Sequence, residues 1–247
     1  MPPVGNASYL ITRFGGGSGV VQDAALSPLR YLGPGALTGT EYRAYQETTF
    51  LSIAADIQGN FLSPSIGNDL SPAQIVGVQV LPSLTLAFRV VNEEASALRV
   101  YAGGTAQGIT HIKLQTAYGN SATASDVYFG VGAFGRVEKD FSLFGQAFRA
   151  SSQLSLPLLG AANRPSYSTT VRYPATAISN PLGILSEVRG VSIAAFPILD
   201  FRNSLEFMLG SGNFLALNYD WNFYSYTHFN KVQSARHAIS VAFLFKF

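Results

Sequence analysis

The sequence predicts an all-β fold, a transmembrane antiparallel β-barrel, on three observations. Charged residues make up 12% of the 247 residues, about half of the usual share, while the chain carries 24 glycines and 13% aromatic residues. No apolar run reaches the roughly 18 residues that a membrane-spanning helix needs. The last ten residues, 238–247, alternate between two faces, and one face is apolar up to the final Phe247. A closed barrel is the other way to satisfy backbone polar groups in lipid, so the three observations agree.

The composition also excludes several kinds of site. The chain contains no cysteine, which excludes disulfides, thiolate metal sites and thiol catalysis. The formal net charge of +2 is too small to indicate a nucleic-acid partner. His111, His228 and His237 are too scattered to form a metal site, so we expect no metal and no cofactor. Residues 1–8 lack the basic and apolar regions of a secretory signal, so we expect the signal peptide to be absent from this numbering.

Two domain-level segments are expected. Residues 15–19 form a glycine-rich tract, and residues 27–35 are dense in turn formers. We therefore interpret residues 1–40 as a flexible N-terminal leader, or as a plug segment in the barrel mouth. Residues 41–247 form the barrel in this interpretation.

Alternation with a period of two residues predicts the individual strands. Between residues 51 and 61, an apolar face that includes Ile53 alternates with a polar face that includes Asp56, as lipid outside and a polar lumen inside require. Residues 76–90 show the strongest alternation of the interior segments. We expect eight strands, which begin near residues 45, 74, 97, 126, 141, 184, 204 and 236.

The connections between these strands divide into short turns and longer loops, which is the usual barrel pattern. We expect short turns at 92–96, 138–140 and 200–203, longer connections at 119–125 and 157–182, and a connection at 231–236 to the closing strand. The segment 157–182 is the longest and is expected to be the main extracellular loop. Additional hairpin turns at 210–213 and near 46–48 would raise the count to ten strands, which stays the alternative.

The inward-facing positions carry charges of both signs. The predicted lumen network contains Asp56, Arg89, Arg99, Arg136 and Asp220. Because an eight-stranded barrel is just wide enough to be filled by side chains, we interpret these residues as an internal set of ion pairs and hydrogen bonds. A pore or a small-ligand site is the alternative interpretation.

Tyr219, Trp221 and Phe223 share one face of the segment 204–228. Aromatic side chains at this spacing are typical of the girdle that anchors a barrel at the level of the lipid headgroups. A carbohydrate-binding platform is the alternative for the same three side chains.

A catalytic alternative rests on His228, which shares a face with Asp220 and has Ser225 nearby in the sequence. A histidine, a carboxylate and a hydroxyl near the membrane boundary could hydrolyse a lipid ester. The spacings of known barrel lipases, deacylases and proteases are not found. We therefore expect no enzyme and assign no catalytic residue.

The terminal strand carries a more specific resemblance. With Val241, Phe243 and Phe245 on one face and Phe247 at its end, it resembles the last strand of the small outer-membrane β-barrel proteins of Gram-negative bacteria, including the OmpA, OmpX and OmpW types. The pattern extends over residues 45–247. The resemblance implies a location in the outer membrane, contact with its lipids, and recognition of the last strand by the barrel-assembly machinery.

The function expected from these observations is non-catalytic. We expect a structural or interaction subunit, which presents loops at the cell surface or docks beside a larger outer-membrane protein through its lipid-facing wall. A narrow channel or hydrophobic-solute transporter is the alternative, and a lipid-modifying enzyme is the third hypothesis.

Overall fold

The computed structural model describes residues 6–66, 73–93, 97–116, 122–164, 188–227 and 231–247. These residues contain no helix long and apolar enough to cross a membrane. They form eleven strands: β1 (Ala7–Asp23), β2 (Ser27–Tyr45), β3 (Thr49–Pro64), β4 (Ile75–Glu93), β5 (Leu98–Gln115), β6 (Ala122–Leu143), β7 (Gln146–Asn163), β8 (Arg189–Ser192), β9 (Ile198–Met208), β10 (Phe214–Tyr226) and β11 (Val232–Lys246).

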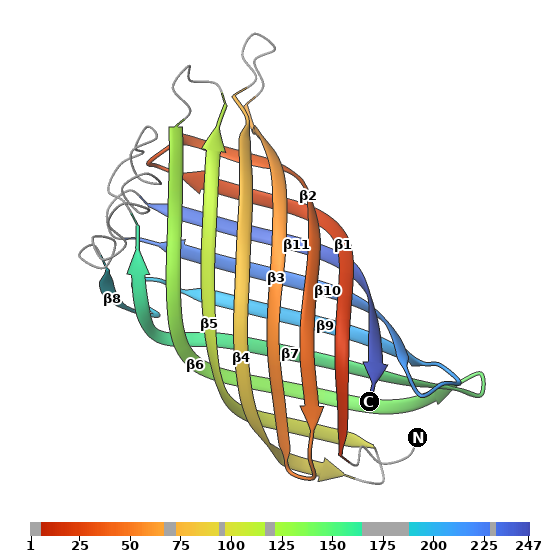
Figure 1. Cartoon of the computed structure of the whole chain (residues 1–247). Helices are drawn as coiled ribbons and strands as arrows, with labels where there is room; N and C mark the ends of the chain where they lie inside the picture. The colour runs from red at the N-terminus through yellow and green to blue at the C-terminus, as the bar shows by residue number, and fades with distance from the viewer. Residues whose placement is uncertain (1–5, 67–72, 94–96, 117–121, 165–187, 228–230) are drawn as a thin grey trace.

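Ten of these strands close into an antiparallel barrel. β1 to β7 pair in sequence order, β7 then pairs with β9, and β9, β10 and β11 lead back to β1. The short strand β8 pairs only with residues 159–162 of β7 and lies outside the ring. Since the number of strands in the ring is even, both chain ends lie at the same end of the barrel (Figure 1). We call this the periplasmic end, because it also holds the short turns at 46–48, 144–145 and 209–213.

The prediction of eight strands is wrong, and the alternative of ten strands is confirmed. Both hairpin turns that supported ten are present: the Gln46 N–H donates to the Thr49 carbonyl at 2.9 Å, and the Leu209 N–H donates to the Asn213 carbonyl at 2.8 Å. The second turn divides the overlong segment 204–228 between β9 and β10. The strand β1 was not expected, and β2 only in the ten-strand alternative, as the strand before the turn near 46–48. The strand expected from about residue 184 corresponds, within the described residues, to β8, which lies outside the ring.

The interpretation of residues 1–40 as a leader or plug is therefore corrected for the described residues. β1 is hydrogen-bonded to β11 on one side and to β2 on the other over nearly its whole length. A Cβ atom at Gly15 or Gly17 would overlap the backbone of β11 at Ile239 or His237. The glycines are thus required by close approach of two strands, rather than by the flexibility that a glycine-rich tract indicates on its own.

Two expected turns are also corrected. Residues 138–140 lie inside β6, and residues 200–203 lie inside β9. The β6–β7 turn is formed by Phe144 and Gly145, which have φ angles of 52° and 75°. Positive φ angles at both residues are typical of the mirror-image turns that connect two-residue hairpins. Of the expected loop 157–182, residues 157–163 belong to β7 and residues 165–182 lie outside the described residues. The expected connection 231–236 is mostly strand, because β11 begins at Val232.

The two faces of the barrel wall differ in chemistry. Large apolar side chains are exposed on the outside, among them Phe14, Phe61, Phe129, Leu86 and Ile239. The lumen is filled by aromatic clusters and by buried charged side chains. An apolar outer wall around a polar interior is the pattern of a transmembrane barrel.

Candidate functional site: the barrel lumen

A central network of ion pairs crosses the middle of the lumen. Arg13 of β1 donates through Nε to Asp56 Oδ1 of β3 at 2.7 Å and through Nη1 to Asp220 Oδ1 of β10 at 3.2 Å. Arg202 of β9 pairs with both carboxylates as well. Gly39 of β2 lies opposite Asp56, and a Cβ atom there would overlap the carboxylate, so the glycine provides the space that this pair occupies.

A second group of pairs extends the network toward the periplasmic end. Arg43 donates through Nε to Glu41 Oε1 at 2.9 Å and through Nη1 to Glu206 Oε1 at 2.8 Å. Arg202 Nη1 also lies 3.4 Å from Glu41 Oε2, which joins this group to the central network. Arg43, Glu41 and Glu206 are buried, as are Arg202 and Asp56 of the central network. Since a buried charge is costly unless it is paired, the positions of these side chains are mutually dependent.

A third group surrounds Glu138 of β6. Its carboxylate accepts from Arg136 Nε and from the Tyr45 hydroxyl, both at 2.6 Å. Arg99 lies 3.4 Å from Glu138 and donates to Asp140 at 2.9 Å. Glu138 and Asp140 are inside a strand, against expectation, because the polar lumen supplies arginines to pair with them.

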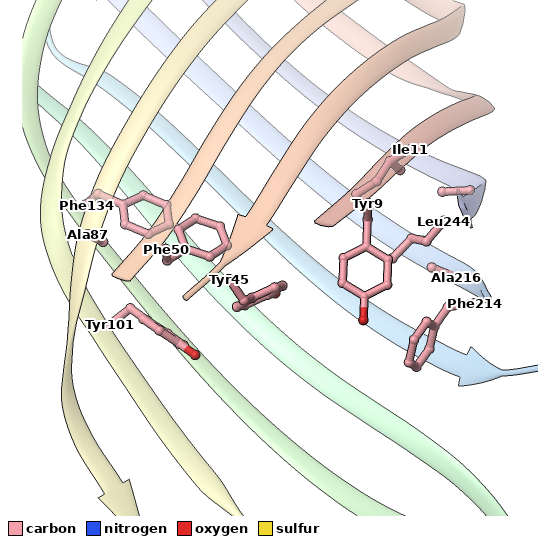
Figure 2. Close-up of a cluster of buried hydrophobic side chains, with 11 residues drawn as sticks. Tyr9, Ile11, Tyr45, Phe50, Ala87, Tyr101, Phe134, Phe214, Ala216 and Leu244 are labelled. Carbon is pink, nitrogen blue, oxygen red and sulfur yellow. The ribbon is translucent and has the colours of Figure 1, made fainter. Parts of the chain in front are cut away.

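An aromatic layer fills the lumen near the periplasmic end (Figure 2). Phe50 stacks on Phe134 with ring centroids 5.7 Å apart, and Tyr9 meets Phe214 edge to face at 5.8 Å. The Arg136 guanidinium lies 5.3 Å from the centre of the Phe50 ring, so the layer is attached to the ion pairs above it.

At the extracellular end, Lys113 and Arg164 each pair with both Asp23 and Asp126. The Tyr224 hydroxyl donates to Asp126 Oδ2 at 2.7 Å and lies 2.7 Å from His111 Nδ1. Because the hydroxyl proton is used on Asp126, His111 Nδ1 must carry the proton of the ring and donate it to Tyr224. His111 Nε2 is then a buried acceptor, without a partner among the described residues.

Phe196, in the turn between β8 and β9, caps this end of the lumen. Its ring lies 4.7 Å from that of Tyr128, 5.5 Å from that of Tyr226 and 5.7 Å from that of Tyr224. Only 3% of Phe196 is exposed, so the turn is folded inward over the His111–Tyr224–Asp126 hydrogen bonds.

A small cavity of about 40 Å³ lies inside the lumen, between the aromatic layer and Tyr224 beneath this cap. Amide and hydroxyl side chains and the charged groups of Asp56, Asp200 and Arg202 line it together with apolar side chains. Asp200 accepts a hydrogen bond from Asn222 at 2.7 Å and one from Gln107 at 3.4 Å. The cavity thus has both polar and apolar walls, and the Asp200 carboxylate in it accepts from neutral donors.

The structure places four of the five predicted lumen residues inside the barrel as buried side chains: Asp56, Arg99, Arg136 and Asp220. Arg89 is half-buried, next to a bulge in the pairing of β4 with β5. Sequence reasoning missed the partners Arg13, Glu41, Arg43, Lys113, Arg149, Arg202 and Glu206. The alternation of Tyr9, Ile11 and Arg13 with Leu10 and Phe14 could have revealed the first of them, but it lies in the segment interpreted as a leader.

Tyr219, Trp221 and Phe223 lie on the outer face of β10. Trp221 stacks on His237 of β11 at 6.4 Å and on Phe223 at 6.5 Å. The Tyr219 hydroxyl also forms a hydrogen bond of 2.7 Å with His237 Nδ1. The interfacial girdle stays a prediction for these residues.

The terminal strand completes the ring. Val241, Phe243 and Phe245 are exposed on the outer wall, each between 46 and 49%. The Phe247 N–H donates to the Ser8 carbonyl at 3.1 Å, and its ring lies 6.1 Å from that of Tyr42. Recognition of this strand by the assembly machinery stays a prediction.

His228, on which the catalytic alternative rests, lies outside the described residues. Within the part of the chain that the structure describes, no group of three or more His, Cys, Asp or Glu side chains is spaced to hold a metal ion.

A closed ten-stranded antiparallel barrel with an apolar outer wall and a polar lumen defines the chain as a β-barrel of the bacterial outer-membrane class. No protein-family model matches the chain, and no curated protein matches it. The chain is similar in structure to the outer membrane protease OmpT from Escherichia coli, with a TM-score of 0.57 and 8% identity over 100% of this chain and 98% of that one.

Two further solved structures match with lower scores. The translocator domain of the autotransporter NalP from Neisseria meningitidis has a TM-score of 0.40 and 9% identity, over 98% of this chain and 88% of that one. An outer membrane channel from Pseudomonas putida F1 has a TM-score of 0.37 and 9% identity, over 99% and 97%. The OmpT similarity shows the fold, but no particular member of the class.

Proposed function

We propose that the protein is a non-catalytic outer-membrane barrel with a filled lumen, which acts as a structural or interaction subunit beside a larger outer-membrane protein. The observation that supports this proposal is the dense filling of the lumen by side chains. The aromatic layer, the four groups of ion pairs and the Phe196 cap occupy it and leave a small cavity beside Asp200. The outer wall and the extracellular end are then the surfaces left for function.

Energetics favour a permanently filled lumen. Separating a buried arginine from its carboxylate exposes two charges to an environment of low dielectric constant, which is strongly unfavourable. In the central network, Asp56 and Asp220 each pair with both Arg13 and Arg202, so movement of one side chain disrupts several pairs. The lumen therefore supports a rigid wall rather than a moving gate.

The subunit proposal is tested by isolating the tagged protein from native outer membranes in mild detergent. We expect a larger outer-membrane protein to co-purify in a fixed ratio, as mass spectrometry would show. A detergent extract of membranes that carry an unrelated tagged barrel is the control. Isolation of the barrel alone from several mild detergents would count against the proposal.

The channel alternative is supported by the cavity near Asp200. We nevertheless expect the purified protein to give no discrete conductance steps in a planar lipid bilayer, because the aromatic layer and the Phe196 cap fill the lumen on the two sides of the cavity. A porin inserted into the same bilayers shows that such steps are detectable. Steps from the folded barrel would favour the channel instead.

A hydrolytic function is not part of this proposal. OmpT is a protease, but 8% identity carries the fold and no activity. The His111–Tyr224–Asp126 hydrogen bonds are fully buried beneath Phe196, where no substrate outside the barrel reaches them. For the lipid-hydrolase hypothesis, the decisive variant is His228→Ala, which should abolish any lipid hydrolysis that the purified protein shows.

A further inference from the structure

A groove lies on the lipid-facing wall across β6, β7, β9 and β10. One row of neighbouring residues explains its shape: Val137 pairs with Ser152, Ser152 with Asn203, and Asn203 with Tyr219. Short side chains at Ser152 and Asn203 form the floor between the larger Val137 and Tyr219. Ala150 continues the floor one step further toward the periplasmic end.

Lys139 borders this groove at its periplasmic side. It lies two residues after Val137 on the same outer face of β6, and its side chain is exposed. Lys139 pairs with Leu98, the first residue of β5, which directly follows the polar connection after Glu93. The lysine is therefore level with the periplasmic end of β5, from where its ammonium group reaches the membrane boundary.

An aromatic row lies directly beside this lysine. Phe141 stacks on Phe148 with centroids 5.6 Å apart, and Phe148 contacts Phe207 at 5.4 Å. All three are on strands β6, β7 and β9, in register with one another. Aromatic side chains gather at the level of the lipid headgroups in barrels, so this row marks the same boundary as Lys139.

We infer that the groove binds an anionic phospholipid of the periplasmic leaflet. The phosphate pairs with Lys139, and one acyl chain lies along the groove against Leu205, Leu217 and Ile239. The Ser152 hydroxyl and the Asn203 amide offer hydrogen bonds to the ester groups between phosphate and chain. The groove combines a cation, hydrogen-bonding side chains and apolar walls, which match the phosphate, the ester groups and the acyl chain of a phospholipid. This chemistry is why a lipid is assigned rather than a protein.

A second groove on the same barrel provides a matched control. It lies on β3, β4 and β5 and includes Ala55, Pro82, Leu84 and Ala106 among its lining residues. Within the described chain, the residues that line it carry no charged side chain. It offers apolar surface to hydrocarbon without a partner for a phosphate.

The test is native mass spectrometry of the purified, folded barrel with added palmitoyl-oleoyl phosphatidylglycerol or the matching phosphatidylcholine. We expect the wild type to retain one phosphatidylglycerol in preference to phosphatidylcholine. Ser152→Phe should weaken this binding roughly tenfold, because the phenyl ring displaces part of the acyl chain from the groove. Lost burial of two methylene groups already corresponds to about that factor. Lys139→Gln should weaken phosphatidylglycerol about threefold and remove the preference over phosphatidylcholine. Ala106→Phe should bind as the wild type does.

Equal binding by the wild type and Ser152→Phe would overturn the inference, as would an equal loss in Ala106→Phe. No preference for phosphatidylglycerol in the wild type would also overturn it. If Ser152→Phe instead releases a co-purified protein while lipid retention is unchanged, the groove is a protein interface. Failure to find any partner protein would affect only the proposed function, because lipid retention is measured on the isolated barrel.

Discussion

Replacement of Arg13 by alanine is expected to lower the free energy of unfolding by about 3–5 kcal/mol, the cost of removing one partner from a buried ion pair. Arg13 is 4% exposed and lies between Asp56 and Asp220. Its loss leaves two buried carboxylates that, among the described residues, share Arg202 as their ion-pair partner. The measurement is urea-induced unfolding of the barrel in phospholipid vesicles, followed by the fluorescence of Trp221, the single tryptophan of the chain.

Two further variants separate the ion pair from a general effect of losing an arginine. Arg30→Ala removes an exposed arginine of β2 and should change the free energy of unfolding by less than about 0.5 kcal/mol. The double variant Arg13→Met with Asp56→Leu removes both charges, so it should be less destabilised than Arg13→Ala alone. If Arg13→Ala is no less stable than Arg30→Ala, the central network does not hold the barrel together.

Deletion of Phe247 is expected to prevent most of the protein from assembling in the outer membrane. The terminal aromatic residue is the part of β11 that the resemblance assigns to the assembly machinery, and its structural contacts are few: one hydrogen bond to Ser8 and one ring contact with Tyr42. The assembled fraction is measured by the mobility of unheated and heated outer-membrane samples on denaturing gels. Phe247→Tyr keeps the terminal ring and should assemble as the wild type does.

Refolding in vitro distinguishes recognition from stability. Without the assembly machinery, the protein lacking Phe247 should refold into vesicles with a loss of about 1 kcal/mol, the contribution of a typical hydrogen bond. Poor refolding in vitro would mean that the terminal contacts are structural. Normal assembly in cells would show that Phe247 is not a recognition signal.

The outward and inward faces of the strands could be predicted because alternation is a local property of the sequence. Asp56 and Asp220 lie in the lumen and Tyr219 on the wall, as the period of two residues required. The turns at 46–48 and 209–213 could likewise be predicted from local residue types. The ion-pair partners of the lumen residues could not be predicted, since Arg13 and Asp220 are separated by more than two hundred positions and meet only when the barrel closes.

The sequence by itself determined the all-β fold, the apolar wall and the closing strand at Phe247, because each follows from neighbouring residues. Only the tertiary structure decided the roles of the glycines at 15–19 and of Glu138. In the sequence alone the glycines resemble a flexible tract, whereas in the structure the neighbouring β11 leaves no room for a Cβ atom at Gly15 and Gly17. In the sequence alone Glu138 resembles a turn residue, whereas in the structure Arg136, Arg99 and the Tyr45 hydroxyl surround it. In both cases deciding contacts come from another strand, and the local sequence does not indicate which strand will be adjacent.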